Sequence, residues 1–199
     1  PLARSPPDPL SYCSDQEPGT IERVQHFKLL GVTVSCDLKW QRHIDSITAK
    51  AAHRLYFLKI LKRSGLQASH LLHFYVTVIR PVLEYCSVVW HHCLTKAQAE
   101  SLEAIQRRAL RIIYPLTVGM PYILALGYAE LTSLFDRRDK LNRKFFNSLL
   151  ESSSCLHSLL PAQRDLNVAS RLRVSSIYPR PQMRTKRYMS LVHYGLLNY

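Results

Sequence analysis

The chain has 199 residues, of which 47% are hydrophobic, which is enough for one compact domain with appendages and excludes a disordered polymer. Its 27 Lys and Arg residues against 14 Asp and Glu residues give a formal charge of +13, which favours a polyanionic partner, nucleic acid before an anionic membrane. No apolar run approaches the roughly 18 residues that span a bilayer. The five cysteines have no regular spacing, which indicates reduced thiols in an intracellular compartment.

The N-terminal part of the chain predicts two different segments. Residues 1–19 contain five prolines and few large apolar side chains, so we expect a disordered leader there. Residues 20–36 are rich in Val, Ile and Phe, which predicts a short β-hairpin with Gly31 as a bulge or a point of close approach. Because a lone hairpin is marginal in water, either its partner sheet lies outside this chain or it packs on the helices that follow.

The most apolar segment, residues 77–90, is the expected centre of a three-helix, antiparallel, thumb-like bundle over residues 37–115. On both sides of it, apolar residues recur at steps of three and four, the spacing of a helix that buries one face. The expected helix starts are Ser35 or Asp37, Ser69, and Thr95 in a capping box with Gln98. The expected stops are Gly65, a kink or break at Pro81, and Pro115.

Residues 116–151 predict additional helices, and residues 152–199 predict an extended basic tail. A short helix should begin at Pro121 and end before Gly127. A long basic helix should follow, capped by Thr132 or Ser133. Its expected apolar face consists of Leu134, Leu141, Phe145 and Leu149. The fold class is therefore mainly α, a helical bundle preceded by a short β-hairpin and followed by an extended tail.

The sequence offers no clear catalytic site. A two-metal polymerase or nuclease needs clustered carboxylates, whereas Glu100 and Glu103 indicate a solvated helix start, and Asp136 and Asp139 can pair with neighbouring arginines. The Cys and His residues do not have the paired spacing of a zinc site, and there is no Gly-rich phosphate loop. We therefore expect no catalytic residues, no metal, no cofactor and no small-molecule substrate.

Basic side chains clustered on the predicted helices are the positive signal, because they offer phosphate contacts to RNA, DNA or an RNA–DNA hybrid. Some of them have an alternative role unrelated to binding, since cations also stabilise the C-terminal end of a helix or lie on a solvated face. The candidate nucleic-acid-binding residues are Lys59, Lys62, Arg63, Arg107, Arg108, Arg111, Arg137, Arg138, Arg143 and Lys144 on helices, and Arg171, Arg173, Arg184, Lys186 and Arg187 in the tail.

Six short segments also carry a family resemblance through their order and spacing. They are Phe27-Lys-Leu-Leu-Gly-Val32, Leu38-Lys-Trp40 with His43-Ile44, Arg54-Leu-Tyr-Phe-Leu-Lys59, Ile79-Arg-Pro-Val-Leu-Glu-Tyr85, Val89-Trp-His91 and Ile105-Gln-Arg-Arg-Ala-Leu-Arg-Ile-Ile113. Together they resemble the downstream part of the reverse transcriptase of non-LTR (LINE-type) retrotransposons. The resemblance covers residue 21 to the C-terminus.

The resemblance implies that residues 20–36 are a remnant of the palm, with Leu30 and Gly31 at the hairpin that grips the primer. The helices would be the thumb, which lies against the RNA–DNA template–primer. The fingers, most of the palm with its aspartate pair, and the endonuclease would precede Pro1. The chain would then be a C-terminal fragment of an RNA-directed DNA polymerase that is inactive alone, needs Mg²⁺ only together with the palm, and acts in nucleus and cytoplasm.

Two alternatives remain open. The chain could be a reverse transcriptase subunit that is active only with an upstream palm, or a non-catalytic helical module for protein interaction. Residues 50–62 also resemble the helical lead-in of AlkB-type RNA-modifying oxygenases, although none of the iron and 2-oxoglutarate ligands of those enzymes is recognisable.

Overall fold

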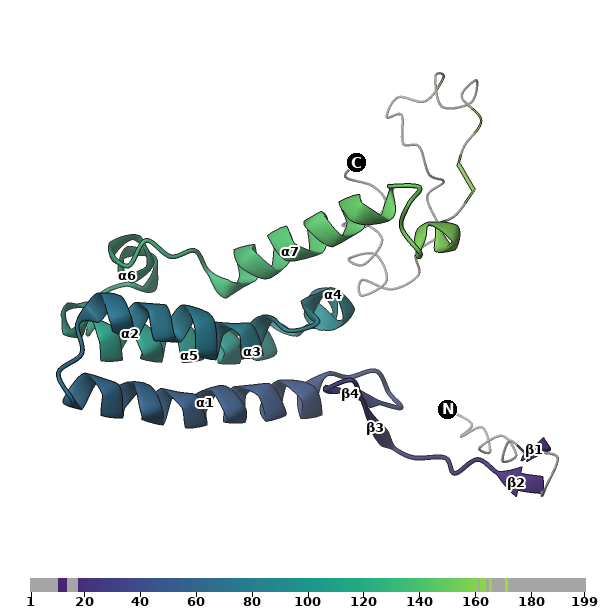
Figure 1. Cartoon of the computed structure of the whole chain (residues 1–199), viewed down its shortest axis with the longest axis horizontal. Helices are drawn as coiled ribbons and strands as arrows, with labels where there is room; N and C mark the ends of the chain where they lie inside the picture. Colours follow the sequence, from purple (N-terminus) through teal and green to yellow (C-terminus); the bar gives the residue numbers. More distant parts are fainter. Residues whose placement is uncertain (1–10, 14–17, 161, 164, 166–170, 172–199) are drawn as a thin grey trace.

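The computed structural model describes residues 11–13, 18–160, 162, 163, 165 and 171. Figure 1 shows helices stacked in layers with two β-hairpins before them, so the predicted mainly α fold is confirmed. The α-helices are α1 (Gln41–Arg63), α2 (Ala68–Phe74), α3 (Arg80–Glu84), α4 (Ser87–Trp90), α5 (Lys96–Ile113), α6 (Tyr122–Tyr128) and α7 (Leu134–Leu149). The strands are β1 (Ser11–Cys13), β2 (Pro18–Thr20), β3 (His26–Leu29) and β4 (Val32–Ser35). Short 3-10 helices cover His91–Cys93, Pro115–Thr117 and His157–Leu159.

The hairpin predicted within residues 20–36 is β3–β4, an antiparallel pair. Its two-residue turn is Leu30-Gly31, with φ angles of 46° and 86°, so both residues adopt the left-handed conformation of a tight hairpin turn. Gly31 is therefore a turn residue and not a bulge, while the Tyr85 ring lies close to it, 3.4 Å from where a Cβ would be. The leader prediction is also wrong in part, because Ser11–Cys13 pairs with Pro18–Thr20 in a second antiparallel hairpin.

Helix α1 ends as predicted but begins differently. Gly65 has a φ of 86°, and its N–H bonds to the Lys62 carbonyl while Leu66 N–H bonds to the Leu61 carbonyl, the pattern of a glycine-terminated helix. At the start, Trp40 occupies the cap position and no side chain caps the helix. Asp37 instead accepts a hydrogen bond from Lys39 N–H at 3.0 Å, and Ser35 ends β4, so neither predicted cap is correct.

The apolar centre forms one continuous helical rod through α2 and α3. A π-helical turn, Tyr75–Ile79, joins them just before Pro81, so of the predicted kink or break at the proline the break does not occur. The chain breaks later, at Cys86, whose φ of 52° is left-handed. The predicted cap Ser69 lies inside α2, which Gln67 precedes as N-cap.

Local signals placed the next helices well. Thr95 and Gln98 form the predicted capping box at the start of α5. The helix ends at Ile113, with Tyr114 as its C-cap directly before Pro115. Helix α6 begins directly after Pro121, but the predicted stop before Gly127 is wrong, because helical hydrogen bonding continues past it, from Ala129 N–H to the Ala125 carbonyl. Ser133 caps α7 by accepting a hydrogen bond from Asp136 N–H.

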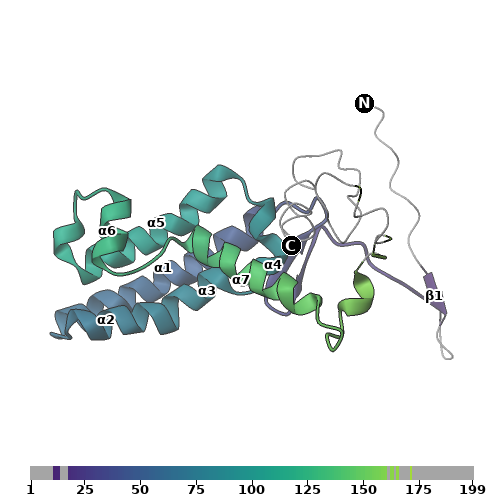
Figure 2. The same ribbon diagram turned by 90° about the horizontal axis from the view of Figure 1, so that it is seen from above.

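The bundle consists of α1, the α2–α3 rod and α5. Gln98 of α5 hydrogen-bonds to Gln41 of α1 at 3.0 Å, and Lys62 near the end of α1 donates to the carbonyl of Ile112 near the end of α5, so these two helices run parallel. The rod runs back beside α5 in the layer above α1, and α7 lies on the side of this layer opposite α1 (Figures 1 and 2). The core includes Ile44, Ala51, Leu55, Leu58, Leu71, Tyr75, Ile79, Leu83, Trp90, Leu102 and Ala109.

The buried face of α7 differs from the prediction. Its buried residues are Leu134, Arg138 and Asn142, spaced four residues apart, whereas Leu141 is exposed. Helix α4 explains the difference, because Ser87 donates a hydrogen bond to Asn142 at 3.1 Å and supplies a polar surface for this face. α7 therefore docks through polar contacts as well as through Leu134.

Candidate nucleic-acid interface

The parallel arrangement of α1 and α5 brings the C-terminal ends of two basic helices together. We name this surface the basic end, and its residues are Lys59, Lys62, Arg63, Arg108 and Arg111. Lys59, Lys62, Arg63 and Ile112 line a shallow recess there, of about 460 Å³. Sequence had predicted all five as binding residues on separate helices, and the structure places them at one end of the bundle.

Within the basic end, Lys62 also has a structural role. Its Nζ donates a hydrogen bond to the backbone carbonyl of Ile112, one of the carbonyls that the last turn of α5 leaves without a helical partner. This contact fixes the separation of the two helix ends. Lys59 and Arg63 are exposed on the neighbouring turns of α1, with their charges directed to solvent.

On α5, the three predicted arginines separate into two groups. Arg107 donates to Glu100 at 2.8 Å and lies over the ring of Tyr122, 4.8 Å from its centroid, so its charge is already partnered. Arg108 and Arg111 are exposed one turn apart. Arg108 lies one turn before Ile112, which lines the recess between α1 and α5.

Acidic residues are missing from the sequence that builds the basic end. No Asp or Glu occurs in residues 46–83, which contain the six bases Lys50, Arg54, Lys59, Lys62, Arg63 and Arg80. None occurs in residues 104–129 either, which contain Arg107, Arg108 and Arg111. The positive charges of this surface therefore have no nearby carboxylate from their own segments to neutralise them.

Most predicted basic residues of α7 are engaged within the protein. Arg137 makes a bidentate pair with Glu84 of α3, with distances of 2.5 and 3.1 Å, and this pair raises the pKa of Arg137. Arg143 donates to Asp139 at 2.8 Å. Lys144 is exposed and remains available to a ligand.

Arg138 is buried completely, which contradicts its predicted contact with nucleic acid. Its Nε donates to His91 Nδ1 at 3.3 Å, and its guanidinium lies 5.7 Å from the centroid of the Trp90 ring. Burial and the charge of Arg138 lower the pKa of His91 to about 3, so His91 stays neutral and can accept this hydrogen bond. Arg138 thus belongs to the interface between α4 and α7.

Glu103 is the residue that sequence reasoning misjudged most. It was expected at a solvated helix start, but it is buried and its carboxylate accepts hydrogen bonds from Tyr122 Oη at 2.6 Å, from Leu134 N–H at 3.3 Å and from Phe135 N–H at 2.7 Å. These N–H groups belong to the first turn of α7. Glu103 therefore supplies a negative charge where that helix favours one.

The predicted grip residues meet the helical rod. Tyr85 Oη donates to the Leu30 carbonyl at 2.9 Å, and a Cβ on Gly31 would lie 3.4 Å from the Tyr85 ring. The turn, Tyr85 and the bases Lys50 and Arg54 border a recess of about 370 Å³. Because Thr33 N–H also donates to His43 of α1, the hairpin packs on the helices, one of the two expected arrangements.

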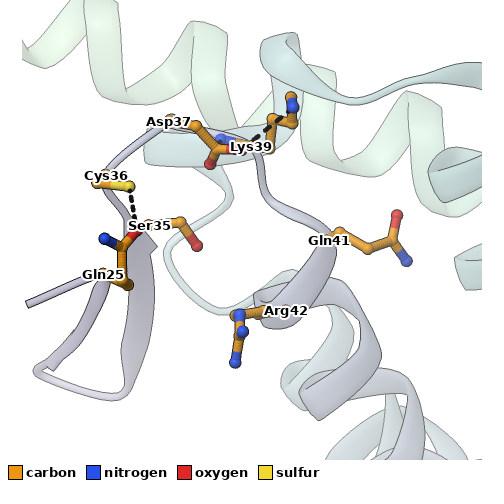
Figure 3. A pocket seen from close by; sticks show the side chains of 7 residues that line it. All are labelled: Gln25, Ser35, Cys36, Asp37, Lys39, Gln41 and Arg42. Atoms are coloured by element: carbon orange, nitrogen blue, oxygen red, sulfur yellow. Dashed lines mark hydrogen bonds and ion pairs between the residues drawn. The ribbon is translucent and has the colours of Figure 1, made fainter.

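A further recess lies where β4 leads into α1, as Figure 3 shows. Arg42 and Ser35 reach toward it, while Cys36 donates to Gln25 at 3.1 Å and Lys39 pairs with Asp37 at 3.3 Å. Of the two basic side chains that Figure 3 labels, Lys39 forms an ion pair with Asp37, and no ion pair is drawn for Arg42. This recess is less basic than the basic end.

Of the predicted tail residues, the structure describes Arg171, which is exposed, while Arg173, Arg184, Lys186 and Arg187 lie outside the described residues. Among the residues with a described placement, no three His, Cys, Asp or Glu side chains come together in a way that could hold a metal ion. Within the same part of the chain, no helix has the length and apolar character that a membrane crossing requires.

Comparison of the chain with protein-family models, with curated proteins and with solved structures finds no match. The functional reading therefore depends on the geometry and charge described above.

Proposed function

We propose that this chain binds nucleic acid through the basic end, without base-specific contacts and without catalysing a reaction by itself. The observation that carries the proposal is that four exposed bases lie at one end of the bundle, since the parallel helices α1 and α5 end there: Lys59, Arg63, Arg108 and Arg111. No carboxylate occurs in the segments around them. Such a surface attracts phosphates and gains affinity from the counterions that nucleic acid releases on binding.

The ligand that we favour is an RNA–DNA template–primer. The segments that resemble the non-LTR reverse transcriptase include the turn residues Leu30 and Gly31 and the segment that ends in Tyr85, and these are in contact. In this proposal the chain is the thumb-like C-terminal part of such a polymerase, and a palm domain is its natural partner.

The test is the salt dependence of binding. Fluorescence anisotropy would follow binding of a labelled RNA–DNA hybrid at several KCl concentrations. The test variant is Lys59→Gln, Arg63→Gln, Arg108→Gln and Arg111→Gln. The control variant removes four exposed charges elsewhere by Lys28→Gln, Arg42→Gln, Lys96→Gln and Lys140→Gln.

We expect the slope of log K against log salt to become shallower by about 3 to 4 in the test variant, because each phosphate contact contributes about 0.9. The control should keep most of the slope of the parent protein. Equal losses in both variants, or no binding of the hybrid at low salt, would refute the proposal.

A second assay addresses catalysis. Primer extension with Mg²⁺ and the chain alone should yield no product, since the described residues bring no carboxylate cluster together that could hold the metal ions. Extension by the purified chain would show that it carries a polymerase site of its own. Extension only after addition of a palm-containing chain would favour the subunit alternative.

A further inference from the structure

Helix α1 carries a second stripe of large side chains on the face that points away from the core. Tyr56 is 61% exposed, Phe57 56% and Ile60 42%, and His53 is exposed one turn before them. In Figure 1, α1 is the outermost helix on its side of the bundle, and no described element covers its outward face. These side chains therefore do not serve the core, which α1 contacts through its opposite face.

Basic residues border this stripe on both sides. Lys59 and Arg63 follow Tyr56 at steps of three and seven residues, so they lie beside it toward α5 and the recess of the basic end. Lys50 lies seven residues before Phe57 and borders the other recess, toward the α2–α3 rod. The stripe is thus an aromatic surface between two cationic edges, in a segment that contains no acid.

We propose that the outward face of α1 binds single-stranded nucleic acid by stacking unpaired bases on Tyr56 and Phe57, while Lys59, Arg63 and Lys50 contact the adjoining phosphates. This inference rests on the proposed function and specifies its ligand, since the basic end alone would accept duplex and single strand alike. Base stacking on exposed aromatic rings beside cations is the physical basis of sequence-tolerant single-strand binding.

Charge and composition favour this occupant over others. A second copy of the chain would bring together two surfaces of the same sign, without carboxylates to offset them. A lipid surface would have little to bury, because only Phe57 and Ile60 in the stripe are both large and wholly apolar. Single-stranded nucleic acid is complementary to this face, because its bases can stack on the aromatic rings and its phosphates can pair with the cations.

The experiment compares two oligonucleotides of equal charge. One is an oligothymidylate of about 12 nucleotides and the other is an abasic oligonucleotide of the same length, a size within the usual range of single-strand sites. The protein should bind the oligothymidylate about tenfold more tightly or better, which corresponds to one stacked base or more. The variant Tyr56→Ala with Phe57→Ala should lose this preference and keep the affinity for the abasic strand.

Two further variants control the experiment. Tyr56→Phe keeps a ring and should keep the preference for bases. Phe27→Ala with Tyr128→Ala removes one exposed phenylalanine and one exposed tyrosine elsewhere, 60% and 53% accessible, and should leave the preference unchanged. Circular dichroism of each variant should match that of the parent, because exposed side chains contribute little to stability.

The outcomes separate this inference from the proposal on which it rests. Salt-dependent binding of the hybrid with no preference for bases over abasic sites would overturn the stacking site and leave the basic end in place. No binding of any nucleic acid at low salt would overturn both. If Tyr56→Ala with Phe57→Ala abolished self-association or adsorption to anionic vesicles while the base preference persisted, the face would serve that contact and stacking would be refuted.

Discussion

Helices α1 and α7 are both basic and lie on opposite sides of the bundle, but they use their charges differently. On α7, Arg137 pairs with Glu84, Arg143 with Asp139, and Arg138 is buried. On α1, Lys59 and Arg63 face solvent in a segment without acids. The comparison teaches that the number of cations on a helix says little about its binding capacity until the carboxylates around it are placed.

The largest effect should come from the carboxylate that anchors α7. Glu103→Ala removes the acceptor of two backbone N–H groups and of the Tyr122 hydroxyl in a buried site. We expect the free energy of unfolding to fall by about 3 kcal/mol, because buried donors lose their partner. Urea denaturation followed by circular dichroism measures this. Glu100→Ala, at an exposed ion pair, should cost less than about 0.5 kcal/mol, and equal costs would contradict the role of Glu103.

Acid should loosen the α4–α7 interface next. His91 has a pKa of about 3 in the folded protein, below its ordinary value of 6.5, so the unfolded chain binds more protons as the pH falls through this interval. Stability should therefore decline below about pH 6.5, by about 1 to 2 kcal/mol at pH 5. His43 and His92, whose pKa values burial also lowers, act in the same direction.

Denaturation midpoints at pH 7 and pH 5 test the acid effect. His91→Gln should reduce the pH dependence of stability. A stability that does not change between these pH values would show that His91 is protonated without cost.

A smaller effect should follow from placing a carboxylate beside a base of the basic end, as Asp139 lies beside Arg143. Ala104→Glu places a carboxylate four residues before Arg108, the same spacing as Asp139 before Arg143. We expect about three- to tenfold weaker binding of the RNA–DNA hybrid at low salt, since one phosphate contact is lost. Ala104→Gln is the uncharged control, and equal affinities of the two variants would exclude Arg108 from the interface.

The smallest effect should come from Arg138, despite its charge. Arg138→Leu removes a cation whose terminal nitrogens have no hydrogen-bond partner among the described residues, and burial lowers its pKa. Replacement of a buried charge by an apolar side chain is often neutral, so we expect a change of about 1 kcal/mol or less in unfolding free energy. Nucleic-acid affinity should not change. A marked loss of affinity would place Arg138 in the interface after all.

The sequence was sufficient to predict those helix ends that are determined by residues close to them along the chain. The capping box at Thr95, the cap at Ser133 and the glycine stop at Gly65 all act within a few residues of their position. The apolar stripes of α1 and α5 were equally readable, because each repeats at the period of the helix. For the same reason the mainly helical fold was predictable.

The misjudged residues depend on partners far along the chain. Glu103 caps a helix that begins 31 residues later, at Leu134, so nothing near it in the sequence signals its burial. The face of α7 was predicted from its apolar residues, but Ser87 of α4 and His91 of the following 3-10 helix bind Asn142 and Arg138 instead. Arg138 and Asn142 follow Leu134 at steps of four residues, the spacing of one helix face. This face was not recognised because the two residues are polar.

The parallel pairing of α1 with α5 has a consequence for synthesis of the protein on the ribosome. Lys62 and Ile112 meet across 50 residues of sequence, so the core face of α1 cannot be covered fully until α5 has emerged. At about 5–20 residues per second, this delay lasts roughly 3 to 10 seconds. During that interval the nascent α1 presents apolar side chains on two opposite faces, the core face and the face with Phe57 and Ile60.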